Sequence, residues 1–399
     1  MPLALLALTL SAFAIGTTEF VIVGLIPTMA TDLQVSLPSA GLLVSLYALG
    51  VAIGAPVLTA LTGKWNRKDV LLAVMALFVA GNVLAWQAPG YETLIVARIL
   101  TGLAHGVFFS IGSTIATGLV AKEKAASSIA IMFTGLTVAL VTGVPIGTYI
   151  GQSFGWQTTF LIVAILGLIA LIGSAFLVPN NLKQPPPTTL SSQLKVLTHP
   201  RLLLVYAITA LGYGGTFTAF TFLAPILESV SGFSSSAISL IMLVYGVSVA
   251  VGNIWGGKMA DKMGPIKALT IIFSGLATVL VVFNFTAVNP IAAVATILVW
   301  GAFAFGNVPG LQVYVVKLAE KHTPDAVDVA SGLNIAAFNV GIALGSWGGG
   351  LIVSEAGLMH TPWVGAVLVI IALALTRLSG HLDKRAQTET DFNAKVKVA

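Results

Sequence analysis

The sequence contains no cysteine, and only 33 of its 399 residues carry a formal charge: 19 Lys or Arg and 14 Asp or Glu. The absence of cysteine excludes disulfides, thiolate metal sites and thiol catalysis. Soluble proteins devote about a quarter of their residues to charge. A charged fraction of 8% therefore leaves too little polar surface for a domain of this size in water, which nearly excludes a soluble enzyme.

Signatures of several other function classes are missing as well. No glycine-rich loop is followed by Lys and Ser or Thr, so ATP-driven transport is not supported. The net charge of +5 comes without a dense basic run or interleaved aromatics, so nucleic acid is not an expected partner. No metal or other cofactor is expected, because the histidines lie in separate segments without metal-ligand spacing. They are His105, His199, His322, His360 and His381.

Long apolar stretches are present instead, and hydrophobic residues make up 57% of the chain. A hydrocarbon core of about 30 Å takes roughly 20 to 25 helical residues to cross, which predicts an all-α polytopic membrane protein with about twelve transmembrane helices. The first stretch lacks a basic n-region and is too long for a signal-peptide core, so we expect a retained helix. The expected spans are about 3–29, 38–62, 69–88, 93–119, 127–152, 158–178, 202–227, 235–257, 266–286, 291–317, 327–352 and 362–379.

The sequence also repeats itself in two six-helix halves. A row of small residues in the fifth span recurs in the eleventh, where Gly341 follows Gly143 by 198 positions. The rows are Ala139, Gly143, Gly147 and Gly151, and Ala337, Gly341, Gly345 and Gly349. Parallel repeats with a substrate site at their interface form an established transporter architecture. The predicted parts are an N-terminal half (1–178), a proline-containing cytoplasmic linker (179–201), a C-terminal half (202–379) and a cytoplasmic tail (380–399).

Charge separates the loops into two sets. Alternate loops on one side contain no Lys or Arg, only Asp32, Glu92, Glu228 and Glu355. Loops on the other side carry Lys64, Arg67, Lys68, Lys122, Lys124, Lys183, Lys195, Arg201, Lys258, Lys262, Lys267, Lys317 and Lys321. The positive-inside rule then places both termini in the cytoplasm of a multi-pass protein of the inner (plasma) membrane.

The loop from Gly257 to Lys267 contains an acid-base pair, Asp261 and Lys262, followed by Gly264. This pattern resembles the signature loop of the major facilitator superfamily. The counterpart in the first half keeps Arg67 and Lys68, with Gly63 where the family usually has Asp and Asn66 where it has Gly. The resemblance implies that these loops take part in gating. A solvated turn that merely obeys the positive-inside rule is the alternative.

Further motifs resemble one branch of this superfamily. Arg98 followed by Gly102 and Gly106 is similar to its basic-residue motif, and Gly143-Val144-Pro145-Ile146-Gly147 to a variant of its antiporter motif. The runs Gly16 to Phe20 and Gly155 to Phe160 resemble the proton-driven drug, sugar and nucleoside exporters, including bacterial arabinose/sugar and purine efflux permeases. The resemblance covers essentially the whole chain and implies a substrate:proton antiporter, without naming the substrate.

Glu19 lies in the middle of the first span. An ionised carboxylate there is costly, so it must face a wet cavity, find a partner or take up a proton. A permanent structural ion pair is the alternative to a proton-coupling role. Arg98 is the one Lys or Arg deep inside a predicted span, and its alternative roles are to bind substrate, to tune an acid or act in gating, or to brace backbone carbonyls.

The helical rise gives the depth of each polar residue. Glu19 lies 13 residues from the outer Asp32, and His105 lies 13 residues from the outer Glu92, which places both about 20 Å deep. Arg98 lies only about 9 Å deep. We therefore expect Glu19 to meet His105, with a histidine bonded to a neighbouring hydroxyl as the alternative. The proton-coupling candidates are Glu19, Arg98 and His105.

Two further sets of residues are candidates for conformational change and for substrate contact. The glycine row of the fifth span permits close helix contact, and Pro145 favours a kink. The gating and packing candidates are Arg67, Lys68, Gly143, Pro145, Gly147, Gly257, Asp261, Lys262 and Gly264. The cavity candidates, for which helix packing is the alternative, are Tyr47, Phe108, Phe109, Tyr213, Phe217, Asn253, Asn307, Asn334, Phe338 and Asn339.

These observations predict a proton-coupled secondary transporter, not an enzyme, that exports a small organic molecule of the drug, sugar or nucleoside class by alternating access. Its expected partners are the substrate, protons and the lipid bilayer, and the expected state is a monomer. The alternatives are a proton-coupled importer or facilitator, and a polytopic membrane enzyme or sensor. The enzyme would require clustered catalytic groups at one membrane depth, where the sequence offers only Glu19 and His105.

Overall fold

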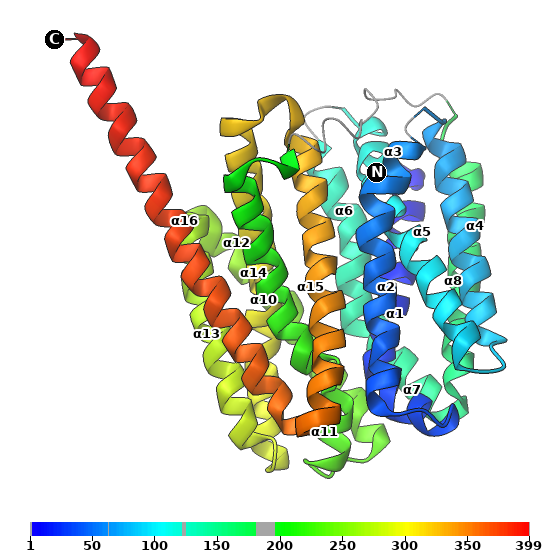
Figure 1. The fold of residues 1–399 in the computed structure, drawn as a ribbon. Helices are drawn as coiled ribbons and strands as arrows, with labels where there is room; N and C mark the ends of the chain where they lie inside the picture. Colours follow the sequence, from blue (N-terminus) through cyan, green and yellow to red (C-terminus); the bar gives the residue numbers. More distant parts are fainter. Residues whose placement is uncertain (1, 63, 122–124, 181–195, 399) are drawn as a thin grey trace.

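The computed structural model describes residues 2–62, 64–121, 125–180 and 196–398. Within these ranges the secondary structure is helical without strands, and 12 helices are long and apolar enough to cross a membrane. Figure 1 shows them as an upright bundle in which both chain termini lie at the same end. The predicted all-α membrane fold is confirmed.

The N-terminal half contains six spans, two of which are interrupted by π-helical turns. Its elements are α1 (Leu3–Asp32), α2 (Leu37–Ile53), η1 (Gly54–Leu58), α3 (Thr59–Leu61), α4 (Arg67–Trp86), α5 (Tyr91–Gly118), α6 (Ala125–Val138), η3 (Ala139–Gly143), α7 (Val144–Phe154) and α8 (Trp156–Leu177). The turn η3 ends two residues before Pro145, and η1 contains Pro56. Proline removes a backbone donor, so an irregular turn at these places has an identifiable cause.

The C-terminal half also contains six spans. Its elements are α10 (Pro200–Phe220), α11 (Leu223–Ser229), α12 (Ser235–Met263), α13 (Pro265–Thr286), α14 (Pro290–His322), η4 (Pro324–Ala326), α15 (Val327–Ala356), η5 (Leu358–His360) and α16 (Thr361–Val398). The helix α10 begins inside the predicted linker, of which residues 181–195 lie outside the described residues. The predicted tail continues the last helix, and α16 extends beyond the bundle in Figure 1.

Short loops reverse the chain between neighbouring helices. Ser234 accepts a hydrogen bond from the backbone amide of Ala237 at the start of α12, as an N-cap does. Gly264 and Gly155 have φ values of 84° and 89° between consecutive helices. Other residue types rarely adopt this conformation. The glycine of the signature loop therefore allows α13 to begin directly after α12.

The buried apolar residues form three clusters, and their division places the contact between the halves. We call the end of the bundle with the chain termini the basic side, and the opposite end the acidic side. The largest cluster joins both halves, from Phe20 and Leu43 in one to Phe220 and Met242 in the other. Two smaller clusters each belong to a single half and lie toward the basic side. They include Leu5, Met75 and Ile115, and Val205, Val315 and Ala330.

Polar and backbone contacts between the halves lie along the same shared cluster. Ser239 on α12 donates a hydrogen bond to Gln152 on α7 over 3.1 Å. Gly246 on α12 faces the backbone of Leu140 in η3 so closely that a Cβ atom would have no room. Among the described residues, the halves are thus packed together through the acidic side and the middle of the bundle, while each keeps its own core toward the basic side.

The two glycine rows pack within their own halves. Gly143 faces the side chain of Thr17 on α1, and Gly341 faces the backbone of Ala210 on α10. These are corresponding helices of the repeat, because α1 and α10 each begin a half. Small residues let helix backbones approach closely in lipid, where that contact is a main source of association. The spacing of 198 residues is therefore matched by equivalent packing.

Candidate functional site

Glu19 and His105 meet in the interior of the N-terminal half. The Oε2 atom of Glu19 on α1 lies 3.8 Å from Nδ1 of His105 on α5. Both residues are buried, with 8% and 5% of their surfaces exposed. The expected proximity from equal depth is confirmed. A carboxyl group and an imidazole at this distance can share or exchange a proton, which is the chemistry a proton-coupled carrier needs.

Tyr47 on α2 completes this group with a hydroxyl and an aromatic face. Its Oη atom lies 2.9 Å from Nδ1 of His105, so that nitrogen faces both the phenol and the Glu19 carboxyl. The ring of Tyr47 supports Arg98, whose Cζ atom lies 4.1 Å from the ring centroid. The hydroxyl partner expected as the alternative for His105 is therefore present together with the acid.

Arg98 is almost completely buried and braces two backbones. Its Nη1 donates to the carbonyl oxygen of Thr18 over 2.8 Å, and its Nε donates to that of Leu43 over 3.3 Å. Its Nη2 has no hydrogen-bond partner among the described residues. Although Arg98 enters the bundle nearer the acidic side, its long side chain reaches the residue next to Glu19. Arg98 thus braces the backbones of α1 and α2 beside Glu19.

A second layer fixes the position of α1 at this point. The hydroxyl of Thr18 donates to Asn82 Oδ1 over 2.8 Å, and Asn82 in turn donates to the carbonyl of Phe78 over 2.8 Å. Both side chains are fully buried. Because Thr18 precedes Glu19, these bonds to α4 set the direction in which the carboxyl points.

Aromatic side chains of both halves surround the residue after Glu19. The ring of Phe20 lies 6.2 Å from that of Phe217 and 6.0 Å from that of Phe305. Tyr213 contacts both of these rings, and its ring centroid lies 4.6 Å from that of Phe338. We call these five residues the aromatic cluster. It is contributed by α1, α10, α14 and α15, so it crosses the interface between the halves.

Unpartnered polar atoms occur in the buried interior of the C-terminal half, within the described part of the chain. They include Oη of Tyr245, Nε1 of Trp300, and the Oδ1 atoms of Asn307 and Asn339. Asn339 follows Phe338 of the aromatic cluster in the sequence, and Asn307 is two residues from Phe305. Buried polar atoms normally find a partner, so these are available to a ligand or to water.

Other predicted cavity residues are engaged in packing. Asn334 on α15 accepts from Thr209 on α10 and donates to Gln312 on α14, which links three helices. Phe108 lies in the core of the N-terminal half next to Phe109, whose ring also contacts His105. Asn253 is only half-buried.

The charged gating candidates lie apart from this site. Arg67 is buried at the start of α4, and its Nε and Nη1 have no partner among the described residues. Lys68 donates its backbone amide to the Asn66 cap. Asp261 and Lys262 are exposed at the end of α12, and within the described ranges neither forms an ion pair. These loops are thus free to pair in another conformation.

The small gating candidates serve helix packing in this conformation. Pro145 and Gly147 lie in α7, where both are buried. Gly147 faces the side chain of Val21 on α1, so that a Cβ atom at this position would collide with it. A Cβ atom at Gly257 would meet only Pro309 on α14, at an ordinary contact distance. Close packing therefore requires glycine at Gly147 but not at Gly257.

Sequence reasoning misses several residues of the site. Phe305 and Gln312 on α14 are not among the predicted candidates, and Phe20 is only part of a motif. A second ion pair joins Arg201 and Asp383 over 2.7 Å, with the hydroxyl of Tyr314 donating to the same carboxylate. The sequence places Arg201 among the loop charges and Asp383 in the tail. Their separation along the chain gives no signal that they meet.

The family model of the Major Facilitator Superfamily matches residues 8–327. The chain belongs to this superfamily. The uncharacterized MFS-type transporter YtbD of Bacillus subtilis is 54% identical over 386 residues, or 97% of each protein. The inner membrane transport protein YdhP of Escherichia coli is 40% identical over 389 residues, again 97% of each. The chain is therefore an integral membrane transporter for a small molecule, and such transporters are not enzymes.

Two further proteins are similar to this chain, one in sequence and one in fold. A chloramphenicol resistance protein of Streptomyces lividans is 32% identical over 382 residues, which cover 94% of this chain and 95% of that protein. A bacterial homologue of the human lysosomal transporter Spinster superposes with a TM-score of 0.75 at 16% identity, over 94% of this chain and 96% of that structure. The superposition supports the fold of two six-helix halves.

Proposed function

We propose that the protein is a proton-coupled exporter of a small organic molecule in which Glu19 carries the proton. The observation on which this depends is the buried contact of 3.8 Å between Glu19 and His105, beside Tyr47 and Arg98. A buried carboxyl that alternates between charged and neutral forms changes its interaction with Arg98 by a full charge. Proton binding thus alters the bonds that hold α1, α2 and α5 together.

The aromatic cluster supplies the link between the proton and the substrate. Phe20 adjoins Glu19 in the sequence and contacts Phe217 and Phe305 of the other half. A substrate bound among these rings would lie between the halves, where binding sites of this architecture form. Aromatic rings favour a partly apolar ligand, and the amide oxygens of Asn307 and Asn339 offer acceptors for its polar groups.

Alternating access follows from the division of the core. We propose that the described conformation is closed at the outer face and that substrate enters from the cytoplasm. Separation of the shared cluster, with contact forming between the basic ends, would give the outward state. The signature loops carrying Arg67, Asp261 and Lys262 lie at the ends that would meet. Charged pairs made in only one state bias a two-state equilibrium.

Orientation, location and direction complete the proposal. The basic loops and both termini share one side of the bundle, which supports cytoplasmic termini by the positive-inside rule. YdhP is named as an inner membrane protein, and we propose the same membrane for this chain. Export is supported by the similarity to a chloramphenicol resistance protein. We propose that a monomer is the working unit, because a single chain contributes both halves of the site.

Proteoliposomes with an internal pH dye test the proposal. Chloramphenicol, arabinose and a purine nucleoside serve as probes, added on one side of the membrane with no proton gradient. The wild type should move protons in the direction opposite to the movement of at least one probe, whereas Glu19→Gln should lose this coupling. Glu228→Gln, which removes an exposed acid from the end of α11, is the matched control and should behave as the wild type. Undiminished coupling in Glu19→Gln would exclude Glu19 as the proton carrier. Proton movement in the same direction as the probe would indicate an importer.

A further inference from the structure

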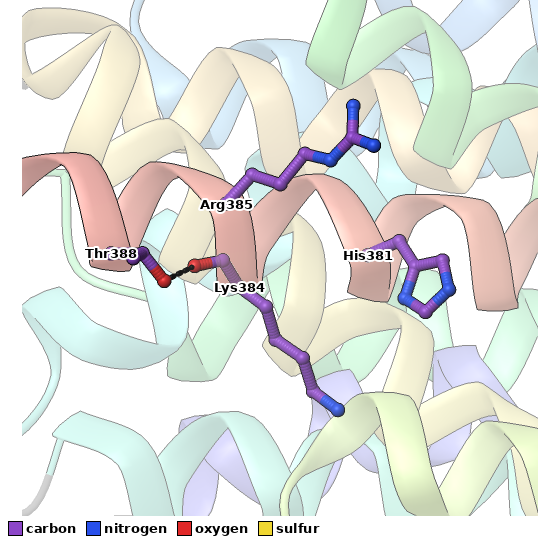
Figure 2. Close-up of a pocket in the computed structure, with 4 residues that line it drawn as sticks. All are labelled: His381, Lys384, Arg385 and Thr388. Carbon is purple, nitrogen blue, oxygen red and sulfur yellow. Dashed lines mark hydrogen bonds between the residues drawn. The ribbon is translucent and has the colours of Figure 1, made fainter.

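The last helix carries a basic face where it leaves the bundle. His381, Lys384, Arg385 and Thr388 line an open surface cavity of about 620 Å³. Figure 2 shows the four side chains projecting from one stretch of α16, with Thr388 hydrogen-bonded to the backbone carbonyl of Lys384 over 3.0 Å. All four residues are exposed. Three of them are cations or can become cations, so the cavity suits an anionic group.

This basic face continues the lipid-facing stripe of the same helix. Val367, Ile371 and Leu378 are exposed apolar residues at spacings of four and seven, which places them on one helix face. Arg385 follows Leu378 by seven residues and His381 follows it by three. The helix face that is apolar and exposed within the bundle therefore continues beyond Leu378 as a basic face on the same side of α16.

The opposite face of α16 is fixed to the bundle at this level. Asp383 accepts from Arg201 Nη2 over 2.7 Å and from Tyr314 over 2.8 Å. Ser379, one turn earlier, accepts from the same Nη2 atom over 3.2 Å. Among the side chains that the structure describes, the nearby carboxylate of Asp383 is thus engaged by the bundle and does not neutralise the exposed cations. The basic face is held outward by these bonds.

Helix length places the face at the depth of lipid headgroups. With a rise of 1.5 Å per residue, the 20 residues from Thr361 to His381 span about 30 Å, the thickness of the hydrocarbon core. Lys384 and Arg385 lie about 5 Å further along the axis. The headgroup layer begins where the hydrocarbon ends, and lipid phosphates lie within it.

We infer that His381, Lys384, Arg385 and Thr388 form a binding site for the phosphate headgroup of an anionic phospholipid. Lys and Arg at this depth favour anionic lipids, and an arginine guanidinium can bind a phosphate with two parallel hydrogen bonds. The hydroxyl of Thr388 donates to the carbonyl of Lys384 in this conformation, and a rotation about its side chain would turn that donor toward a phosphate. A lipid whose tails lie along Val367, Ile371 and Leu378 would have its headgroup at these side chains. This inference holds whichever molecule the protein transports.

Native mass spectrometry on full-length protein in detergent tests this site. Phosphatidylglycerol is titrated against the wild type and against the double variant Lys384→Gln/Arg385→Gln. Removal of two cations near a lipid surface should weaken phosphatidylglycerol binding roughly 10- to 30-fold. Lys317→Gln/Lys321→Gln is the matched control, because it removes two exposed cations from the end of α14 on the same side. That variant should retain wild-type affinity.

Competitors and a charge-adding variant distinguish a lipid site from a simple anion site. Thr388→Glu adds a carboxylate to the face and should weaken phosphatidylglycerol binding without removing a cation. Inorganic phosphate and zwitterionic phosphatidylcholine should not compete with phosphatidylglycerol at equal concentration. An equal loss in the α14 control, or unchanged affinity in Lys384→Gln/Arg385→Gln and in Thr388→Glu, would overturn the site. Competition by inorganic phosphate would replace the lipid site with a site for small anions.

Discussion

The guanidinium of Arg98 lies over the ring of Tyr47, with 4.1 Å between its Cζ atom and the ring centroid. The same tyrosine places its hydroxyl 2.9 Å from His105. Tyr47 therefore serves the two basic residues of α5 with different parts of one side chain. Its ring stabilises a permanent cation, and its hydroxyl faces a group that can change charge.

Variants of Tyr47 should separate these two contacts. Tyr47→Phe keeps the ring under Arg98 and removes the hydrogen bond to His105, which should cost about 1 kcal/mol of unfolding free energy. Tyr47→Leu also removes the cation–π contact, with a further loss of about 1 to 2 kcal/mol at this buried position. Thermal unfolding in detergent measures both. Equal stability of the two variants would show that the ring contributes nothing to holding Arg98.

Two glycines of α15 should respond oppositely to the same substitution. A Cβ atom at Gly345 would collide with the backbone of Gly214 on α10, so Gly345→Ala must force the helices apart. We expect a loss of about 2 kcal/mol or more, as for other overpacked interiors. Apart from the adjoining residues and the helix's own backbone, no described atom lies within 4 Å of the Cβ position at Gly348, so Gly348→Ala should be neutral or stabilising. Thermal unfolding of the two single variants is the measurement, and similar losses would contradict this packing.

Substitution of Asn334 and of Asn253 by alanine should have different effects on stability, although both are amide residues within transmembrane helices. Asn334→Ala breaks bonds to Thr209 and Gln312 in a fully buried position, with an expected loss of roughly 1 to 2 kcal/mol. Asn253 is half-buried, so Asn253→Ala should change stability by less than about 0.5 kcal/mol. Denaturation of each purified variant decides between them. A stable Asn334→Ala would mean that the three-helix link is dispensable.

Cross-linking across the acidic side should stop the transport cycle. Gln152 and Ser239 belong to different halves and are hydrogen-bonded over 3.1 Å. Since the sequence has no cysteine, Gln152→Cys/Ser239→Cys carries the only two thiols. A short cleavable bis-thiosulfonate linker should block uptake of the probe into vesicles, and reduction should restore it. The single-cysteine variants treated in the same way should remain active. Persistent transport in the linked protein would show that this contact does not open.

The sequence predicts the helices and one important meeting point because both depend on constant helical rise. Glu19 and His105 lie equally far from their outer loops, and equal depth is sufficient when two helices are neighbours. The same arithmetic is less informative for Arg98. It counts backbone positions, whereas the long side chain of Arg98 reaches past its own level to the carbonyl of Thr18.

The aromatic cluster cannot be predicted from the sequence because it depends on helix rotation. Apolar residues occur on every side of α1, so their pattern does not indicate which face meets the other half. The sequence therefore does not distinguish Phe20 and Phe305 from aromatic residues that face lipid. In contrast, the glycine rows indicate their own faces, because Gly341 and Gly345 have a use only where two backbones approach.

The division of the apolar core has a consequence for how the chain can be assembled. Each half has a core of its own, and one cluster of buried side chains joins the two. The two halves therefore pack against each other in the way that two subunits of a dimer do, although one polypeptide contains both. Fragments 1–180 and 181–399, produced together in one membrane, should recombine through Phe20, Leu43 and Phe220 into a working carrier. The covalent connection would then ensure that the two halves are made in equal amounts, and the packing between the halves would not depend on it.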